Sequence, residues 1–180
     1  MSENPPFILW RVEPIKPLTV SKAGQSELFW FNIMPTKEEL KEKLRLKEAE
    51  TLFDAELYDG AVYLCGYAVE FALKARICQL LDVNEYPSYG RLKTAYAVHD
   101  LSQLLLLSGL KNKMSAGDIK LRTNWFLITP DSSSPDQKMI WTPEIRYQPK
   151  GFILKKEAED ILNAVREEPN GRLKWIMTHW

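Results

Sequence analysis

Glu70, Lys74 and His99 carry side chains that could do chemistry in this 180-residue chain. Glu70 and Lys74 are four residues apart, the spacing that pairs opposite charges on one helix face. Together they could line a cleft that binds phosphate or a partner. Alternatively they form a structural pair inside the fold, which would need further hydrogen bonds because burying charge is unfavourable. His99 could act in acid–base chemistry, or it could fix the turn before the helix cap Asp100.

Arg146 is the remaining charged candidate, because its guanidinium could hold a phosphate, an RNA backbone or a partner subunit's carboxylate. Alternatively, Arg146 anchors its own loop to Glu144 or to a helix C-terminus. Tyr67 and Tyr147 could stack on a base, or could be half-buried tyrosines of the fold. The candidate catalytic residues are thus Arg146 and His99, and the candidate binding-cleft residues are Glu70, Lys74, Tyr67 and Tyr147.

Signatures of other enzyme classes are missing from the sequence. It contains no Gly-rich phosphate loop, no Gly-x-Ser-x-Gly elbow and no His-Glu-x-x-His motif. A nucleotidyltransferase active site, with its Gly-Ser and paired acids, is also missing. Cys65 and Cys78, with His99 and His179, do not have the spacing of a zinc site. We therefore expect neither a metal nor a cofactor.

The overall composition is that of an ordinary globular domain. Lys plus Arg and Asp plus Glu number 24 each, so the formal net charge is zero, and 45% of residues are hydrophobic. This excludes a wholly disordered chain and a protein that binds nucleic acid by bulk charge. The stretch 36–82 is acidic and the stretch 83–150 is mildly basic. A local basic face could come from Arg91, Lys93, Lys111, Lys113, Lys120 and Arg122.

No segment resembles a membrane span or a signal peptide. Apolar runs such as Leu104 to Leu107 are far below the roughly 18 residues that a span needs. Cys65 and Cys78 lie on one predicted helix, about 20 Å apart at ~1.5 Å per residue, too far for a disulfide. Buried free thiols are typical of a reducing compartment, so we expect a cytoplasmic protein.

Helical patterns dominate from residue 36 onward. Thr36 to Glu39 form a capping box that opens a helix, whose apolar stripe continues to Phe53 through a highly charged stretch. The strongest helix spans about Asp59 to Leu81. Its small residues share one line, which lets a neighbouring helix approach closely and is typical of a central bundle helix. These residues are Ala61, Cys65, Ala68, Ala72 and Ala75.

The later elements complete a bundle of about five helices. The predicted helices are Leu101–Ser108, capped by Asp100 and stopped at Gly109; Ser115 to Trp125 or Ile128; Phe152–Glu168; and a short terminal piece, Arg172–Trp180. The fold class is therefore all-α, an up-and-down helical bundle over 36–180. Residues 1–35 are rich in proline and aromatics, and are predicted to be an extended arm packed on the body or a partner-binding tail.

Three blocks of this sequence, taken in order, resemble the HEPN domain. They are Gly60-Ala-Val-Tyr-Leu-Cys-Gly-Tyr-Ala-Val-Glu-Phe-Ala-Leu-Lys-Ala75, then His99-Asp-Leu101, then Glu144-Ile-Arg-Tyr147 before a final helix. The resemblance covers residues 44–168. It implies a helical bundle that commonly dimerises, found in toxin–antitoxin pairs, often beside a small nucleotidyltransferase, and in phage defence and RNA processing.

Many HEPN domains are metal-independent ribonucleases, with an arginine followed after four to six residues by a histidine. By this resemblance Arg146 stands at the arginine position, but residues 151–153 are Gly, Phe and Ile. Arg91 and His99 have seven residues between them, one too many. Arg172 and His179 meet the spacing but follow the wrong helix. The chain therefore resembles a variant without the catalytic pair at its expected place.

We expect a HEPN-like module that dimerises and binds a partner protein, RNA or nucleotide without catalysis. One alternative is a metal-independent endoribonuclease with a displaced histidine. Another is a structural subunit of a larger assembly that uses the aromatic arm for docking. The expected partners are a second copy of the chain and a nucleotidyltransferase or other protein, with no membrane.

Overall fold

The computed structural model describes residues 36–42, 45–88, 90–114, 118–126, 141–168 and 170–180. The predicted arm, residues 1–35, lies outside these ranges. Within them the chain is all-α, as predicted, and the β-pairing among these residues is an isolated bridge between Thr36 and Glu85. Among the described helices, none is long and apolar enough to cross a membrane.

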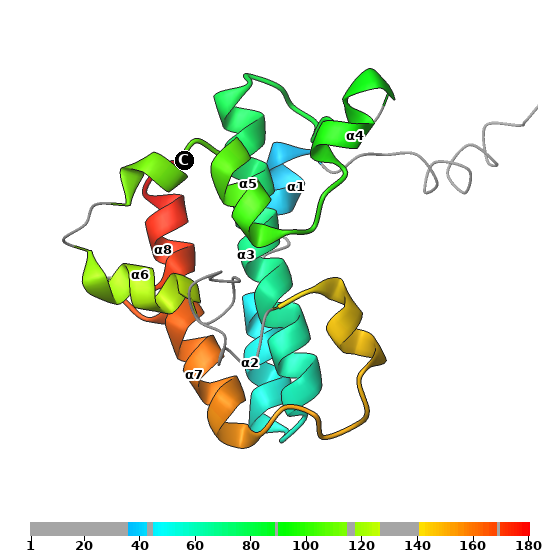
Figure 1. Cartoon of the computed structure of the whole chain (residues 1–180), viewed down its shortest axis with the longest axis vertical. Coiled ribbons are helices and arrows are strands. Elements are labelled where there is room, and N and C mark those ends of the chain that lie inside the picture. Colours follow the sequence, from blue (N-terminus) through cyan, green and yellow to red (C-terminus); the bar gives the residue numbers. More distant parts are fainter. Residues whose placement is uncertain (1–35, 43–44, 89, 115–117, 127–140, 169) are drawn as a thin grey trace, which may run out of the picture. The chain divides into compact units, whose positions relative to one another are not determined.

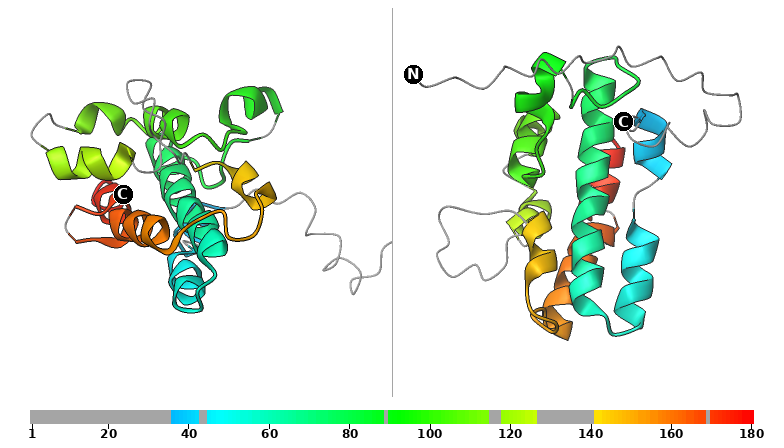
Figure 2. Two further views of the ribbon diagram at one scale, coloured as in Figure 1. Left: turned by 60° about the horizontal axis from the view of Figure 1, so that its bottom comes forward. Right: turned by 90° about the vertical axis from the view of Figure 1, so that its right-hand side faces the viewer.

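The long helix α3, Tyr58–Leu80, is the centre of the bundle. The helices α1 (Lys37–Glu42) and α2 (Leu46–Asp54) pack along one side of it, and α5 (Leu101–Leu107), α7 (Lys155–Arg166) and α8 (Arg172–Met177) pack around the rest. Figures 1 and 2 show α3 running through the molecule between these groups. The predicted line of small residues is buried along its whole length, with exposures of 2% or less. Close approach of several helices to α3 is therefore confirmed.

Shorter elements connect these helices. They are η2 (Gly90–Leu92), α4 (Lys93–Tyr96), η3 (Lys111–Lys113), α6 (Ile119–Phe126) and η4 (Pro143–Tyr147). The tyrosine-rich stretch before Asp100 thus contains η2 and α4. The helix predicted to start at Ser115 begins at Ile119 among the described residues.

Two predicted caps are present. The Glu39 amide donates to Thr36 Oγ1 over 3.2 Å, and the Thr36 amide donates to Glu39 Oε2 over 2.9 Å, which completes the capping box. The Gln103 amide donates to Asp100 Oδ1 over 2.8 Å at the start of α5. These local signals were readable from the sequence because each cap uses residues three positions apart.

The helix that opens at Thr36 is shorter than predicted. It stops at Glu42, and a second helix, α2, starts at Leu46 after Arg45, which has a φ of 53°. A non-glycine residue in this left-handed region interrupts helical hydrogen bonding. The single helix predicted from Thr36 to Phe53 is therefore wrong, and two helices take its place.

The last long helix also starts later than predicted, at Lys155 instead of Phe152. Asp59, at the start of α3, accepts hydrogen bonds from the Gly151 amide (2.6 Å) and the Ile153 amide (2.8 Å). Gly151 has a φ of 79°, which is outside the helical region. These two contacts hold the segment before α7 in a non-helical conformation.

Gly66 allows the η4 segment to pack against α3. A Cβ built on Gly66 would lie 2.0 Å from the Trp141 indole, so any side chain there would collide with the ring. The Trp141 Nε1–H donates to the Tyr63 carbonyl over 3.1 Å, and Trp141 is 3% exposed. The glycine of the Gly66-Tyr67 motif is thus explained by the ring that lies on it.

Candidate functional site

Glu70 is the most deeply buried of the candidate residues, with 1% of its side chain exposed. The Lys74 ammonium donates to Glu70 Oε1 over 2.7 Å. His99 Nδ1 lies 3.0 and 3.1 Å from the two Glu70 oxygens, so the ring donates from Nδ1 to the carboxylate. The carboxylate therefore has two basic partners, the additional hydrogen bonds that a buried pair requires.

Lys74 is mostly enclosed. Its side chain is 12% exposed, and its ammonium lies 5.0 Å from the ring centroid of Tyr86 as well as against Glu70. The Tyr86 hydroxyl in turn donates to the Tyr96 carbonyl over 2.9 Å. This geometry favours the structural interpretation of the Glu70–Lys74 pair over an open phosphate cleft.

His99 occupies the border between this pair and solvent. Its side chain is 53% exposed although Nδ1 is held by Glu70. A histidine with one ring nitrogen fixed by a carboxylate presents the other in a defined orientation, which is the arrangement found in acid–base histidines. The same contact also ties the segment before α5 to α3.

Tyr67 connects the Glu70 cluster to the surrounding aromatic side chains. Its ring centroid lies 5.0 Å from Tyr63, 5.2 Å from Trp141 and 6.5 Å from His99, all in edge-to-face geometry. Burial, followed by the hydrogen bond with Tyr63, raises the pKa of Tyr67 above its usual value. Tyr67 is therefore half-buried among the aromatic side chains of the bundle.

Arg146 is exposed and is held by two tyrosines. Its Nη2 donates to the Tyr147 hydroxyl over 2.9 Å, and its Nη1 donates to the Tyr63 hydroxyl over a long 3.5 Å. These bonds raise the pKa of Arg146, so the guanidinium stays charged. Its Cζ also lies 4.7 Å from the Tyr147 ring centroid, and Tyr147 is 74% exposed. A fixed cation and an open ring therefore stand side by side at the surface.

Glu144 is the carboxylate of η4, the element that carries Arg146. The pKa of its carboxyl is lowered chiefly by a hydrogen bond from Thr142 and by its backbone, with smaller contributions from the charges of Arg146 and His99. Among the described residues no ion pair joins Glu144 to Arg146. The anchoring of Arg146 thus runs through tyrosines instead of the predicted carboxylate.

Tyr63 belongs to the site but was not singled out from the sequence. It lies one helical turn before Tyr67 on α3, and it contacts Tyr67 and Arg146. The hydrogen bond with Tyr67 and then that with Arg146 lower the pKa of Tyr63. The i,i+4 spacing of two tyrosines inside the Gly60–Ala75 block was the available signal.

Arg172 and His179, the pair that meets the motif spacing, do not present two open side chains. Arg172 has an exposure of 0%, and His179 Nδ1 lies 2.9 Å from the Trp175 carbonyl, to which it donates. The six basic residues considered for a local face are all exposed, but they come from η2, α4, η3 and α6. Figure 1 shows α4 and α6 on opposite sides of α3, so these residues do not form one continuous face.

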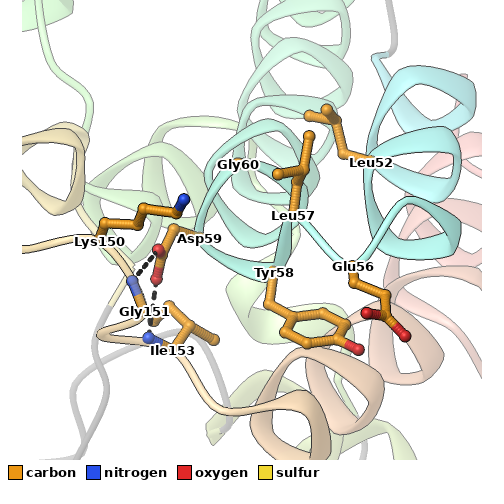
Figure 3. Close-up of a pocket in the computed structure, with 9 residues that line it drawn as sticks. All are labelled: Leu52, Glu56, Leu57, Tyr58, Asp59, Gly60, Lys150, Gly151 and Ile153. Atoms are coloured by element: carbon orange, nitrogen blue, oxygen red, sulfur yellow. Dashed lines mark hydrogen bonds between the residues drawn. The ribbon is translucent and has the colours of Figure 1, made fainter.

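A separate pocket of about 380 Å³ lies at the start of α3 (Figure 3). It is lined by Leu52, Glu56, Leu57, Tyr58, Asp59, Gly60, Lys150, Gly151 and Ile153. The candidate residues of the sequence are not among them. The Asp59 carboxylate at its edge is used to hold the Gly151 and Ile153 amides. In the part of the chain that the structure describes, no three His, Cys, Asp or Glu side chains gather where they could hold a metal.

Comparison with known proteins gives one family. Residues 42–113 match the HEPN domain, which confirms the resemblance over that range. No curated protein and no solved structure matches the chain significantly. The matched range includes Tyr67, Glu70, Lys74 and His99, whereas Arg146 and Tyr147 lie beyond it.

Proposed function

We propose that this HEPN-containing bundle binds RNA or a nucleotide, without cleaving it, through a surface that we call the Arg146 face. This face consists of Arg146 and Tyr147. The observation that carries the proposal is the exposed Arg146 guanidinium, which donates hydrogen bonds to two tyrosine hydroxyls and lies next to an open Tyr147 ring. The setting implied by the family is toxin–antitoxin, defence or RNA-related.

The chemistry of this face suits a phosphate followed by a base. A guanidinium donates in a planar fork that matches two phosphate oxygens. Because Tyr147 is 74% exposed, a base can stack on the ring face that Arg146 does not cover. Two tyrosines hold the guanidinium before any ligand arrives, which reduces the entropy lost on binding.

Absence of cleavage is supported by the backbone around Arg146. Arg146 lies in η4, and α7 begins only at Lys155, so the residues where a histidine would be expected are in the intervening segment. Those residues are Gly151, Phe152 and Ile153, and none can exchange protons. Two of their amides are bound to Asp59, which fixes this segment against α3.

The proposal is tested by RNA binding measured by fluorescence anisotropy with a labelled single-stranded RNA. Replacing Arg146 by Ala should weaken binding by about 10- to 150-fold, since a charge-assisted hydrogen bond is worth roughly 1.5–3 kcal/mol. The matched control is Arg122→Ala, which removes an exposed arginine from α6. Equal affinities of the wild type and the Arg146→Ala variant would refute the proposal.

A metal-independent endoribonuclease is the second candidate, and the geometry of His99 favours it. The Glu70 carboxylate fixes Nδ1 and leaves the other ring nitrogen for proton transfer. Tyr67 lies between the two residues: its ring centroid is 6.5 Å from that of His99 and 5.0 Å from that of Tyr63, whose hydroxyl accepts from Arg146. The test is RNA cleavage in the presence of a metal chelator. If the wild type cleaves RNA there, and both Arg146→Ala and His99→Ala abolish the cleavage, the protein is a ribonuclease and the proposal of binding without cleavage is wrong.

We also propose that the chain dimerises, as the family commonly does, and that a nucleotidyltransferase or another protein could bind it. Support comes from exposed apolar side chains. Leu57, which lines the pocket of Figure 3, is 50% exposed. Phe152 and Leu154, the sequence neighbours of the lining residue Ile153, are 46% and 64% exposed. Light scattering measures the mass in solution. A dimer is expected for the wild type and a monomer for Leu154→Asp, whereas a monomeric wild type would contradict the proposal.

A further inference from the structure

Arg172 carries a positive charge in the interior, where the described residues offer it no polar partner. It is the first residue of α8, its exposure is 0%, and its three guanidinium nitrogens make no hydrogen bond within the described part of the chain. The contact that the structure gives this cation is with an aromatic ring: Cζ lies 5.1 Å from the ring centroid of Trp125 on α6. A cation–π contact offsets only part of the lost hydration.

The surroundings disfavour this charge strongly. Burial lowers the pKa of Arg172 well below its usual value, and the interacting group that opposes this shift is the thiol of Cys65. Arginine nevertheless remains protonated in proteins, because its reference pKa is so high. A conformation in which the guanidinium reaches an anion would therefore be favoured electrostatically.

Helix α6 is the cover that separates Arg172 from solvent on the Trp125 side. It spans Ile119–Phe126, packs mainly against α7 and α8, and lies at the edge of the bundle in Figures 1 and 2. Polar contacts tie it to the body. Lys120 pairs with Glu167 at the surface, and the Asn124 amide donates to the Asn170 carbonyl over 3.0 Å. Burial of Leu121 and Trp125 favours the closed position, and the charge of Arg172 favours the open one.

We infer that α6 opens, and that the exposed Arg172 guanidinium then binds an oxyanion, whose forked oxygens it matches. Phosphate and carboxylate share this chemistry. Binding shifts the population toward the open form, because the closed form offers the anion no access. This site is independent of the Arg146 face, which lies on η4.

The test measures amide hydrogen exchange of the α6 peptide in the full chain at constant ionic strength. Phosphate or acetate replaces chloride in separate arms, which distinguishes the two oxyanions. We expect faster exchange in α6 with at least one oxyanion in the wild type, in the exposed-arginine control Arg122→Met and in Arg146→Ala. In Arg172→Met, neither phosphate nor acetate should change the exchange rate of the α6 amides. Unchanged α6 exchange with both oxyanions in the wild type would overturn the inference.

A second measurement examines the premise without any ligand. Replacing Arg172 by the apolar and similarly long Met should raise the melting temperature by several degrees, because it removes an unpaired buried charge. A melting temperature that falls in Arg172→Met would show that the guanidinium is satisfied where it lies, which would also overturn the inference.

Discussion

At the scale of single residues, Glu70 is a buried charge whose partners come from two separate parts of the chain. Its buried carboxylate accepts one hydrogen bond from Lys74, which lies on the same helix, and another from His99, which lies in the segment before α5. The i,i+4 spacing made the Glu70–Lys74 pair predictable. The contact with His99 was not predictable, because it joins positions 29 residues apart through the fold.

Replacing Glu70 by Gln should destabilise the protein by about 3 kcal/mol, because breaking a buried pair leaves an uncompensated charge. Urea denaturation measures this change. Asp160→Asn is the matched control: it breaks the exposed Lys156–Asp160 pair and should change stability by at most about 0.5 kcal/mol. Equal effects of the two substitutions would mean that Glu70 is not a buried partner of Lys74.

Gly66→Ala should destabilise the protein by about 1–3 kcal/mol, because the new Cβ overlaps the Trp141 ring and the core must shift. Thermal unfolding measures the loss. Gly60→Ala on the same helix is the control, since its Cβ would meet a Leu52 methyl carbon at 3.1 Å, and that flexible side chain can adjust. A Gly66→Ala variant as stable as Gly60→Ala would contradict the packing of Trp141 on α3.

At the scale of elements, local signals predicted the caps and the central helix, and long-range contacts decided the remaining boundaries. Thr36 and Asp100 each cap a helix with a partner three residues away. The late start of α7 depends on Asp59, 92 positions from Gly151 in the sequence. No glycine or proline lies near Arg45, so the sequence did not predict a helix break there. Boundaries of this kind require the fold itself.

Asp59→Ala should loosen the segment before α7. Two amide donors would lose their carboxylate, and since these groups are partly exposed the expected cost is about 1–2 kcal/mol. Hydrogen exchange of the Ile153 amide should become faster while that of α5 stays unchanged. Unaltered exchange at Ile153 would mean that Asp59 does not hold this segment.

At the scale of the whole molecule, both thiols lie inside the bundle, and this predicts an alkaline limit of stability. Burial raises the pKa of Cys65 to about 12 and that of Cys78 to about 11, from an ordinary value of 9.0. The folded state therefore holds these protons more tightly than the unfolded state. Their contribution to stability is complete below pH 9.0 and is lost as the pH rises toward 11 and 12.

Urea denaturation as a function of pH checks this dependence. The free energy of unfolding should fall above pH 9.0 in the wild type and fall less in a Cys65→Ala, Cys78→Ala double variant. Identical pH profiles would show that the thiols do not titrate with unfolding. Thiol reagents should also react slowly with the folded protein at neutral pH, because both groups are protonated and buried.

The all-α class and the HEPN resemblance were predictable because α3 has both a clear helical pattern and the Gly60–Ala75 block in one continuous stretch. The residues of the Arg146 face were each predicted, but not their arrangement. Arg146 contacts Tyr63 on α3, 83 positions away, and that contact depends on the packing of Trp141 over Gly66. The sequence pattern contains no direct sign of either contact.

The central claim, that Arg146 contacts a phosphate, is tested most directly by the salt dependence of RNA binding. Each phosphate neutralised on a single strand adds about 0.7 to the slope of log affinity against log salt concentration. The wild type should show a slope steeper than that of Arg146→Ala by about this amount for one contact, on RNAs of different sequence. Equal slopes for the two proteins would contradict the account.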